Sequence, residues 1–253
     1  ITGASSGIGA TYAEHLARRG HNLILVARDL QRLDALAQRL RQVHGVTVEN
    51  IKADLTRKDD MLKIEQRLRS DAVISVLINN AGVAMSGNLA ESDPDSADEL
   101  IQLNVVALTR LSAAASASFS AAGRGAIINI ASVVALNPEM FNAVYSASKA
   151  YVLSLTQTLH SEIGKLGVQV QAVLPGMTRT EIWGRSGVDE SGLPAEMVMD
   201  VDELVAAALA GFDQGELVTI PSLPDVADWR AFVSARGHLA PNLSHRHAAA
   251  RYK

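Results

Sequence analysis

Cysteine is absent from the 253 residues of the chain, and this excludes a disulfide framework and a thiolate metal site. Aromatic residues make up only 4% of the chain, too few for a platform on which nucleic-acid bases stack. Positive charge is also in short supply, because the net charge of −4 is opposite in sign to that of most nucleic-acid-binding domains. These shortages predict a cytoplasmic protein that has no nucleic-acid partner.

Long apolar runs are missing as well. The alanine-rich residues 101–122 come nearest to a membrane span, but Asn104, Arg110 and several serines interrupt them. We therefore predict a packed helix there and no membrane partner. No signal peptide is visible, and 48% hydrophobic against 20% charged residues is the composition of a globular protein with a substantial core.

Apolar segments typical of buried strands alternate with longer segments typical of helices. The predicted strands are residues 23–26, 46–51, 73–78, 126–130, 168–174 and 217–220. The predicted helices are residues 30–43, 59–69, 96–119 (with a bend near Gln102), 145–166, 201–212 and 225–235. Strands joined by helices in this way form a parallel sheet covered on both faces. The pattern predicts an α/β fold with a doubly wound parallel sheet of about seven strands.

Residues 1–253 are predicted to form a single domain, because proline and glycine mark no linker and no repeat is visible. An apolar strand should precede the glycine-rich turn of residues 2–9. We therefore expect the first strand to be truncated and the natural chain to begin upstream of Ile1. Residues 176–200 are rich in glycine and methionine without a clear period, and we predict a substrate lid there, as is common for long loops.

Tyr145 and Lys149 stand four residues apart in a predicted helix, so their side chains would lie on one face of it. A free phenol loses its proton at about pH 10, and a neighbouring cation lowers that pKa. The pair can therefore serve as a proton donor to a carbonyl oxygen. The alternative is a chance spacing in which Lys149 is solvated. Ser132 lies upstream, at the end of an apolar run.

The turn Thr2-Gly-Ala-Ser-Ser-Gly-Ile-Gly9 precedes an amphipathic helix that runs to about Arg19. Its glycines, at positions 3, 7 and 9, allow a tight turn and close approach of the backbone to a phosphate. The amides at the helix N-terminus would then bind a pyrophosphate. A plain connection between a strand and a helix is the alternative, but a turn at the first such junction of a parallel sheet favours a dinucleotide site.

The tip of the next strand indicates which dinucleotide is bound. An acidic residue there would hydrogen-bond the ribose 2′-hydroxyl of NAD. The strand instead ends in Val26-Ala27-Arg28, and Asp29 comes one residue late. The planar guanidinium of Arg28 can bind a 2′-phosphate through two hydrogen bonds, although a plain surface charge is the alternative. We predict NADP(H) in preference to NAD(H).

In combination these motifs resemble the short-chain dehydrogenase/reductase family, and the resemblance covers nearly the whole chain. Its elements, in chain order, are the Thr-Gly-x3-Gly-x-Gly turn of residues 2–9, Asp54, the Asn-Asn-Ala-Gly segment of residues 79–82, Asn104, Ser132, Tyr145 with Lys149, and Pro175-Gly176 followed by Thr178 and Thr180. Residues 176–200 match no family consensus. The resemblance implies a Rossmann-type fold, a nicotinamide dinucleotide cofactor and an oxidoreductase activity.

The resemblance also implies roles for four side chains. Ser132 would orient the carbonyl of a small-molecule substrate, and Tyr145 would donate a proton to its oxygen, or act as the base in the reverse reaction. Lys149 would lower the pKa of Tyr145 and hold the nicotinamide ribose. Asn104 would support a water-mediated proton path to Lys149. The alternatives are a strand-end cap for Ser132 and a polar group satisfied by backbone for Asn104.

The predicted site is larger than these four residues. The predicted cofactor-binding residues are Gly3, Ser5, Ser6, Gly7, Ile8, Gly9, Arg28, Asp54, Leu55, Asn80, Ala81, Gly82, Tyr145, Lys149, Pro175, Gly176, Thr178 and Thr180. The predicted lining of an apolar substrate pocket is Val134, Phe141, Met177 and Trp183, although such residues also serve as core or oligomer contacts. No metal site is predicted, because His245 and His247 have no carboxylate beside them.

The sequence thus predicts an NADP(H)-dependent oxidoreductase that interconverts a carbonyl and a secondary alcohol by hydride transfer. Two alternatives remain open. One is a catalytically silent dinucleotide-binding sensor or scaffold, and the other is a different Rossmann enzyme such as an epimerase or a methyltransferase. Family members commonly form dimers or tetramers, so a homodimer or a homotetramer is expected.

Overall fold

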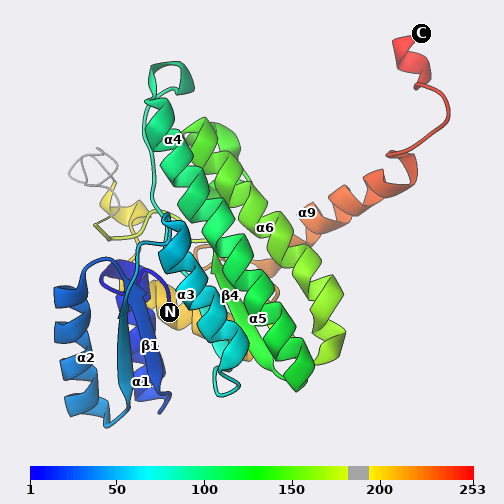
Figure 1. The fold of residues 1–253 in the computed structure, drawn as a ribbon. Helices are drawn as coiled ribbons and strands as arrows, with labels where there is room; N and C mark the ends of the chain where they lie inside the picture. The colour runs from blue at the N-terminus through cyan, green and yellow to red at the C-terminus, as the bar shows by residue number, and fades with distance from the viewer. Residues whose placement is uncertain (182–193) are drawn as a thin grey trace. The chain divides into compact units, whose positions relative to one another are not determined.

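The computed structural model describes residues 1–181 and 194–253 (Figure 1). The chain divides into two compact units, residues 1–221 and 222–253, which are described separately. The strands of the first unit are β1 (Leu23–Ala27), β2 (Val48–Lys52), β3 (Val76–Asn79), β4 (Gly125–Ile130), β5 (Val168–Val173) and β6 (Val218–Thr219). Its longer helices are α1 (Gly7–Arg18), α2 (Leu30–His44), α3 (Lys58–Ser70), α4 (Pro94–Ile101), α5 (Leu108–Ala122), α6 (Ala143–Ile163) and α8 (Val201–Asp213).

The strands pair in parallel, in two ladders: β1 with β2, and β3 with β4, β5 and β6 in that order. The segment before α1 joins the two ladders. Thr2 N donates to Ile78 O of β3 at 3.0 Å, and Val26 N of β1 donates to Ile1 O at 2.9 Å. The order across the sheet is therefore β2, β1, residues 1–4, β3, β4, β5 and β6. This is a doubly wound arrangement, in which the strand order reverses at the N-terminal segment.

The predicted Rossmann-type α/β fold is confirmed, although the described residues form six strands instead of about seven. The difference lies in residues 1–4, which occupy a central strand position but contribute only an isolated bridge, between Thr2 and Val26. The predicted single domain over residues 1–253 stays a prediction. The second unit contains helix α9 (Val226–Leu239), none of whose residues is buried.

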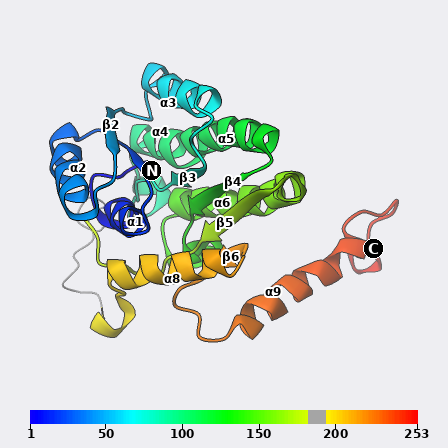
Figure 2. The same cartoon turned by 90° about the horizontal axis from the view of Figure 1, so that it is seen from below.

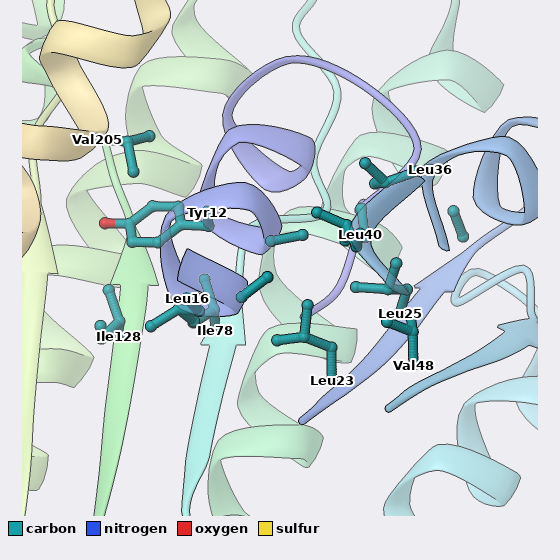
Figure 3. Close-up of a cluster of buried hydrophobic side chains, with 14 of the residues drawn as sticks. Tyr12, Leu16, Leu23, Leu25, Leu36, Leu40, Val48, Ile78, Ile128 and Val205 are labelled. Atoms are coloured by element: carbon teal, nitrogen blue, oxygen red, sulfur yellow. The ribbon is translucent and has the colours of Figure 1, made fainter. Parts of the chain in front are cut away.

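Helices α1, α2 and α8 cover one face of the sheet (Figure 2). Tyr12 of α1 is fully buried and lies near Val205 of α8 and Ile128 of β4 (Figure 3). Leu40 of α2 and Leu25 of β1 belong to the same cluster. Burying a side chain of this size stabilises a fold by about 1.5–3 kcal/mol, so this cluster fixes α1, and with it the glycine turn, against the sheet.

Helices α3, α5 and α6 cover the other face, where Phe119 of α5 is buried with Leu68 of α3 and Ile163 of α6. The stretch Pro94–Ala122 is long and apolar enough to cross a membrane by length and composition. That criterion is weak, because core helices of globular proteins also meet it. Leu111 of the same stretch is buried in this cluster too, as expected for a packed helix.

Replacing Phe119 with alanine should lower the free energy of unfolding by about 3–5 kcal/mol, because the change leaves a cavity among packed side chains. Phe232 of α9 is 45% exposed and provides the matched control. Its replacement by alanine should cost about 1 kcal/mol or less. Urea denaturation of both variants measures the two values, and equal losses would contradict the burial of Phe119.

Candidate functional site

Six loops meet at the carboxyl edge of the parallel sheet, because each follows a segment that runs in the same direction. The first predicted site residue on each loop is Gly3 after the N-terminal segment, Arg28 after β1, Asp54 after β2, Asn80 after β3, Ser132 after β4 and Pro175 after β5. Residues that are far apart in the sequence are thereby brought to one edge. In doubly wound sheets this edge is where ligands bind.

The turn before α1 has backbone angles that glycine adopts far more readily than other residues. The φ angle is 64° at Gly3 and 51° at Gly7. A β-carbon on Gly3 would also lie 2.8 Å from the Cα of Ala81. Helix α1 begins at Gly7. Within the described residues, its N-cap residue Ser6 makes no side-chain hydrogen bond to the first amides of the helix. The first amides of α1 are therefore left for an anion such as a pyrophosphate.

Thr2 and Asn80 tie this turn to the end of β3. The hydroxyl oxygen of Thr2 accepts hydrogen bonds from Asn80 N and Ala81 N, at 3.0 and 3.1 Å. The Asn80 side-chain amide donates to Thr2 O and Gly3 O, also at 3.0 and 3.1 Å. The sequence did not mark Thr2 as a site residue. Gly9, predicted to bind the cofactor, instead permits close packing, since a β-carbon on it would lie 2.4 Å from Gly3 O.

A cavity of about 460 Å³, the first of two at this edge, opens beside the turn. The predicted cofactor-binding residues that line it are Gly3, Ser5, Ser6, Gly7, Ile8, Arg28, Asp54, Leu55, Asn80, Ala81, Gly82 and Thr180. Its other lining residues were not predicted, and they are Val26, Ala27, Asp29, Ala53, Val83, Ala84, Leu103 and Glu181. Most of the unpredicted residues are small or apolar, and only their position beside the strand ends could have indicated them.

Arg28 makes one end of the first cavity basic. Its side chain is 59% exposed, and its Nη1 lies 3.7 Å from Glu99 Oε1. The carboxylate of Asp29 is engaged elsewhere, because it caps α2 by accepting from Arg32 N at 3.0 Å. Both side chains line the first cavity, and that of Asp29 is also bound to Arg32.

A second cavity, of about 340 Å³, contains the predicted catalytic groups. The predicted residues that line only this cavity are Ser132, Val134, Phe141, Tyr145, Lys149, Pro175, Gly176, Met177 and Thr178. The two cavities adjoin each other, because both are lined by Ile8, Asn80, Gly82, Val83, Ala84 and Thr180. Trp183, also predicted to line the substrate pocket, lies outside the described residues. Asn104 lines neither cavity.

Tyr145 lies in the first turn of α6, where Asn142 fixes the helix N-terminus. The side-chain oxygen of Asn142 accepts from Val144 N and Tyr145 N, at 3.0 and 3.2 Å. Its amide donates to Gly87 O at 2.8 Å. The ring of Phe141 meets that of Tyr145 edge-on, with the ring centroids 5.3 Å apart. These contacts hold the phenol in the second cavity.

Burial opposes charge on both Tyr145 and Lys149. It raises the pKa of Tyr145 to about 12, against a smaller lowering by the hydrogen bond with Ser132. It lowers the pKa of Lys149 to about 8. The Nζ of Lys149 donates to Ile130 O at 2.9 Å and lies 5.6 Å from the Tyr145 ring centroid. The predicted lowering of the Tyr145 pKa is therefore not found, because burial outweighs the hydrogen bond with Ser132.

Asn104 lies in a π-helical stretch, Gln102–Ala107, between α4 and α5, where the sequence predicts a bend. Its side chain accepts from Val83 N and donates to Val83 O, both at 2.9 Å, and donates to Ser148 Oγ at 3.3 Å. A β-carbon on Gly82 would lie 3.1 Å from Asn104 Oδ1. Asn104 thus clamps the segment after β3, as π-helical turns at functional sites often do for a ligand-binding segment. Its part in a water-mediated proton path stays a prediction.

A buried polar network behind the site was not predicted. The amide of Asn79 in β3 donates to Ser112 Oγ of α5 at 3.0 Å and to Asn129 Oδ1 of β4 at 2.9 Å. The amide of Asn129 in turn donates to Thr156 Oγ1 of α6 at 3.0 Å. Buried networks of this kind fix elements relative to one another, although Asn79 Oδ1 has no hydrogen-bond partner among the described residues. Asparagine within an apolar strand was the available signal in the sequence.

The loop after β5 forms the remaining wall of the second cavity. Pro175 O accepts from Val133 N at 3.0 Å and from the Ser132 hydroxyl at 3.4 Å. Thr178 forms an isolated parallel bridge with Met199, which joins the two ends of the predicted lid. The middle of that segment falls outside the described residues, so the lid stays a prediction.

The chain matches the model of the short chain dehydrogenase family over residues 1–191. A solved short-chain dehydrogenase from Sphingobium yanoikuyae, in complex with NADPH, is 56% identical with a TM-score of 0.96, over 100% of this chain and 98% of the other. The bulky-bulky ketone specific alcohol dehydrogenase from Comamonas testosteroni is 51% identical with a TM-score of 0.92, over 100% and 96%. An uncharacterized oxidoreductase of Staphylococcus saprophyticus is 33% identical over 87% of this chain and 92% of its own.

The fold and the two cavities therefore define a dinucleotide-binding α/β oxidoreductase. The chain belongs to the short-chain dehydrogenase/reductase family, as the sequence predicts. It is an NAD(P)-dependent oxidoreductase of CH–OH groups. This confirms the predicted enzyme class over an epimerase or a methyltransferase.

The lowered pKa of Lys149 makes the stability of the protein depend on pH. Between its folded-state pKa of about 8 and its ordinary pKa of 10.5, the unfolded chain binds more protons at this residue than the folded chain. The folded state should therefore gain stability as the pH rises from about 7.5 to about 9.5, by on the order of 2 kcal/mol from this residue.

The free energy of unfolding is measured across this pH range for the wild type and for Lys149→Met. The wild type should gain stability with rising pH, and the variant should lack that gain. Lys165→Met, at an exposed position, is the control and should keep it. Parallel pH profiles of the wild type and Lys149→Met would contradict the lowered pKa.

Proposed function

We propose that the protein interconverts a carbonyl compound and a secondary alcohol and uses NADP(H) in preference to NAD(H). The observation that carries this proposal is that the two cavities adjoin each other through shared lining residues. The glycine turn and Arg28 line one cavity, and Ser132, Tyr145 and Lys149 line the other. A dinucleotide in the first cavity is thereby next to the groups that can move a proton.

The residues of the first cavity fit a nicotinamide dinucleotide. The turn at residues 5–7 carries the unshielded helix amides that suit a pyrophosphate, and Asp54 with Leu55 would contact the adenine side. Lys149 would hold the nicotinamide ribose, and Thr180 lies where it can contact the diphosphate or the carboxamide. When bound, the nicotinamide supplies or accepts the hydride.

Tyr145 is the proposed proton donor. Because burial raises its pKa to about 12, the phenol keeps its proton at neutral pH. The Ser132 hydroxyl would hold the carbonyl oxygen, and Tyr145 would give its proton to that oxygen as the carbonyl carbon is reduced. In the reverse direction the phenolate of Tyr145 takes the proton from the alcohol, and the positive charge of Lys149 stabilises it.

An apolar ketone, or the matching secondary alcohol, is the proposed substrate. The walls of the second cavity are mainly apolar, with Ile130, Val133, Val134, Met140, Phe141 and Met177. The similar Comamonas testosteroni enzyme is described as specific for bulky-bulky ketones, which supports the same substrate class here. A panel of ketones and secondary alcohols, followed at the nicotinamide absorbance band with each cofactor, tests this. Binding of NADPH without turnover across the panel would favour a silent sensor.

We further propose a cytoplasmic homodimer or homotetramer that binds neither nucleic acid nor a membrane. The lack of cysteine fits a reducing compartment, and the negative net charge is unfavourable for nucleic-acid binding. The family resemblance supports association through the helices that flank the site. Light scattering of the purified protein measures its oligomeric state.

Replacing Tyr145 with phenylalanine removes only the proton that the mechanism transfers. Turnover should fall by about 100- to 10,000-fold, while the dissociation constant of NADPH stays within about twofold. Tyr151→Phe, on the same helix at a 38% exposed position, is the matched control and should keep full activity. Steady-state kinetics and fluorescence titration measure both effects. Retained turnover in Tyr145→Phe would remove this residue from the mechanism.

Replacing Arg28 with alanine should weaken NADPH binding by about tenfold or more, because a charge-assisted hydrogen bond to the 2′-phosphate is lost. NADH binding should change little, since NADH has no such phosphate. Arg124→Ala, in the exposed turn before β4, is the control for loss of one positive charge. Titration with both cofactors gives the ratio of affinities, and an equal loss for both would count against Arg28 as the phosphate ligand.

A further inference from the structure

An ion pair joins the first turn of helix α2 to the loop after β5, beside the first cavity. Nη1 of Arg32 lies 2.8 Å from each carboxylate oxygen of Glu181, although the residues are 149 positions apart in the sequence. Glu181 lines the cavity together with Thr180, and Asp29, three residues before Arg32, lines it from the β1 side. The pair therefore connects the loop after β5 with the start of α2, which follows the loop after β1.

The Arg32 end of the pair is anchored to helix α2. Its amide donates to Asp29 Oδ1 at 3.0 Å, and its Nε lies 3.4 Å from Asp29 Oδ2. The hydrogen bond and the charge of Glu181 raise the pKa of Arg32 further, so its charge is permanent. Two carboxylates thus surround this guanidinium, in contrast to that of Arg28, whose Nη1 lies 3.7 Å from Glu99 Oε1.

The other end is anchored next to the glycine turn. Arg179 N donates to Met199 O at 3.0 Å, and Met199 N donates to Met177 O at 2.9 Å. A β-carbon on Gly7 would lie 3.3 Å from the methyl carbon of Thr180. The loop after β5 therefore runs along the first residue of α1, beside the amides that suit a pyrophosphate.

We propose that the Arg32–Glu181 ion pair is a strap that retains the bound dinucleotide, with both residues acting as positioning residues. The inference rests on the proposed function, since it takes the first cavity as the cofactor site. A strap that joins the two walls slows dissociation without contacting the 2′-phosphate. Its loss should raise the dissociation rates of NADPH and NADH by the same factor, whereas loss of Arg28 affects NADPH alone.

The expected effect is modest, because the two side chains are 47% and 48% exposed and solvent screens their attraction. Breaking the pair should speed dissociation by about two- to fivefold at low ionic strength. The difference from the wild type should shrink as salt is added, since salt screens exposed charges. This salt dependence distinguishes a strap from a change in the packing of the loop.

Stopped-flow displacement of NADPH and of NADH from the full chain tests the strap. Glu181→Gln and Arg32→Gln should each release both cofactors faster by this factor. The double variant should be no faster than either single variant, because either change alone removes the pair. Asp213→Asn breaks the exposed Arg19–Asp213 pair, in which Arg19 Nη2 lies 2.9 Å from Asp213 Oδ2, and as the matched control it should leave both rates unchanged.

Three results would overturn the proposal. Unchanged dissociation rates in both single variants would overturn the strap alone, provided that the wild type binds NADPH. An effect of Arg32→Gln confined to NADPH would also overturn it, because Arg32 would then be a ligand of the 2′-phosphate. A wild-type chain that binds neither cofactor would overturn the strap and the proposed function together.

Discussion

The hydrogen bonds between Thr2 and Asn80 fix the glycine turn to the end of β3, and the whole site depends on this junction. Each residue contributes both backbone and side-chain atoms, so neither segment can shift without breaking several bonds at once. The turn is thereby held where α1 begins, and the chain just after Asn80 is held where Asn104 clamps it at Val83. The first and the second cavity consequently share part of their walls.

The residues proposed to carry the chemistry could be singled out from the sequence because each lies in a short motif, at a strand end or in the first turn of a helix. Arg28, Ser132 and Tyr145 all line the cavities. Val83 and Leu103 line the first cavity as well, but a small or apolar side chain is equally typical of a core, so only the topology reveals them. The alternation of strands and helices was predictable from hydrophobic periodicity, whereas the strand order rests on hydrogen bonds between distant segments.

The electrostatics of the Tyr145–Lys149 pair could not be predicted from spacing. Helical geometry does bring the ammonium to 5.6 Å from the phenol ring centroid. The sequence does not reveal that Lys149 is buried and Tyr145 partly buried, and this loss of solvent disfavours the charged form of each. The uncharged forms of Tyr145 and Lys149 are therefore both more favoured than their spacing indicates. A group that must keep its proton until a carbonyl oxygen arrives benefits from that environment.

The π-helical stretch between α4 and α5 affects how this site can be altered by mutation. Leu100 and Leu111 are buried on either side of Gln102–Ala107. A π-helical turn takes up more residues than an α-helical one, so the clamp depends on the number of residues in the turn as well as on Asn104. Substitutions preserve that number, and insertions or deletions do not. The number of residues in this turn is thus a requirement of the site that is separate from the identity of any side chain.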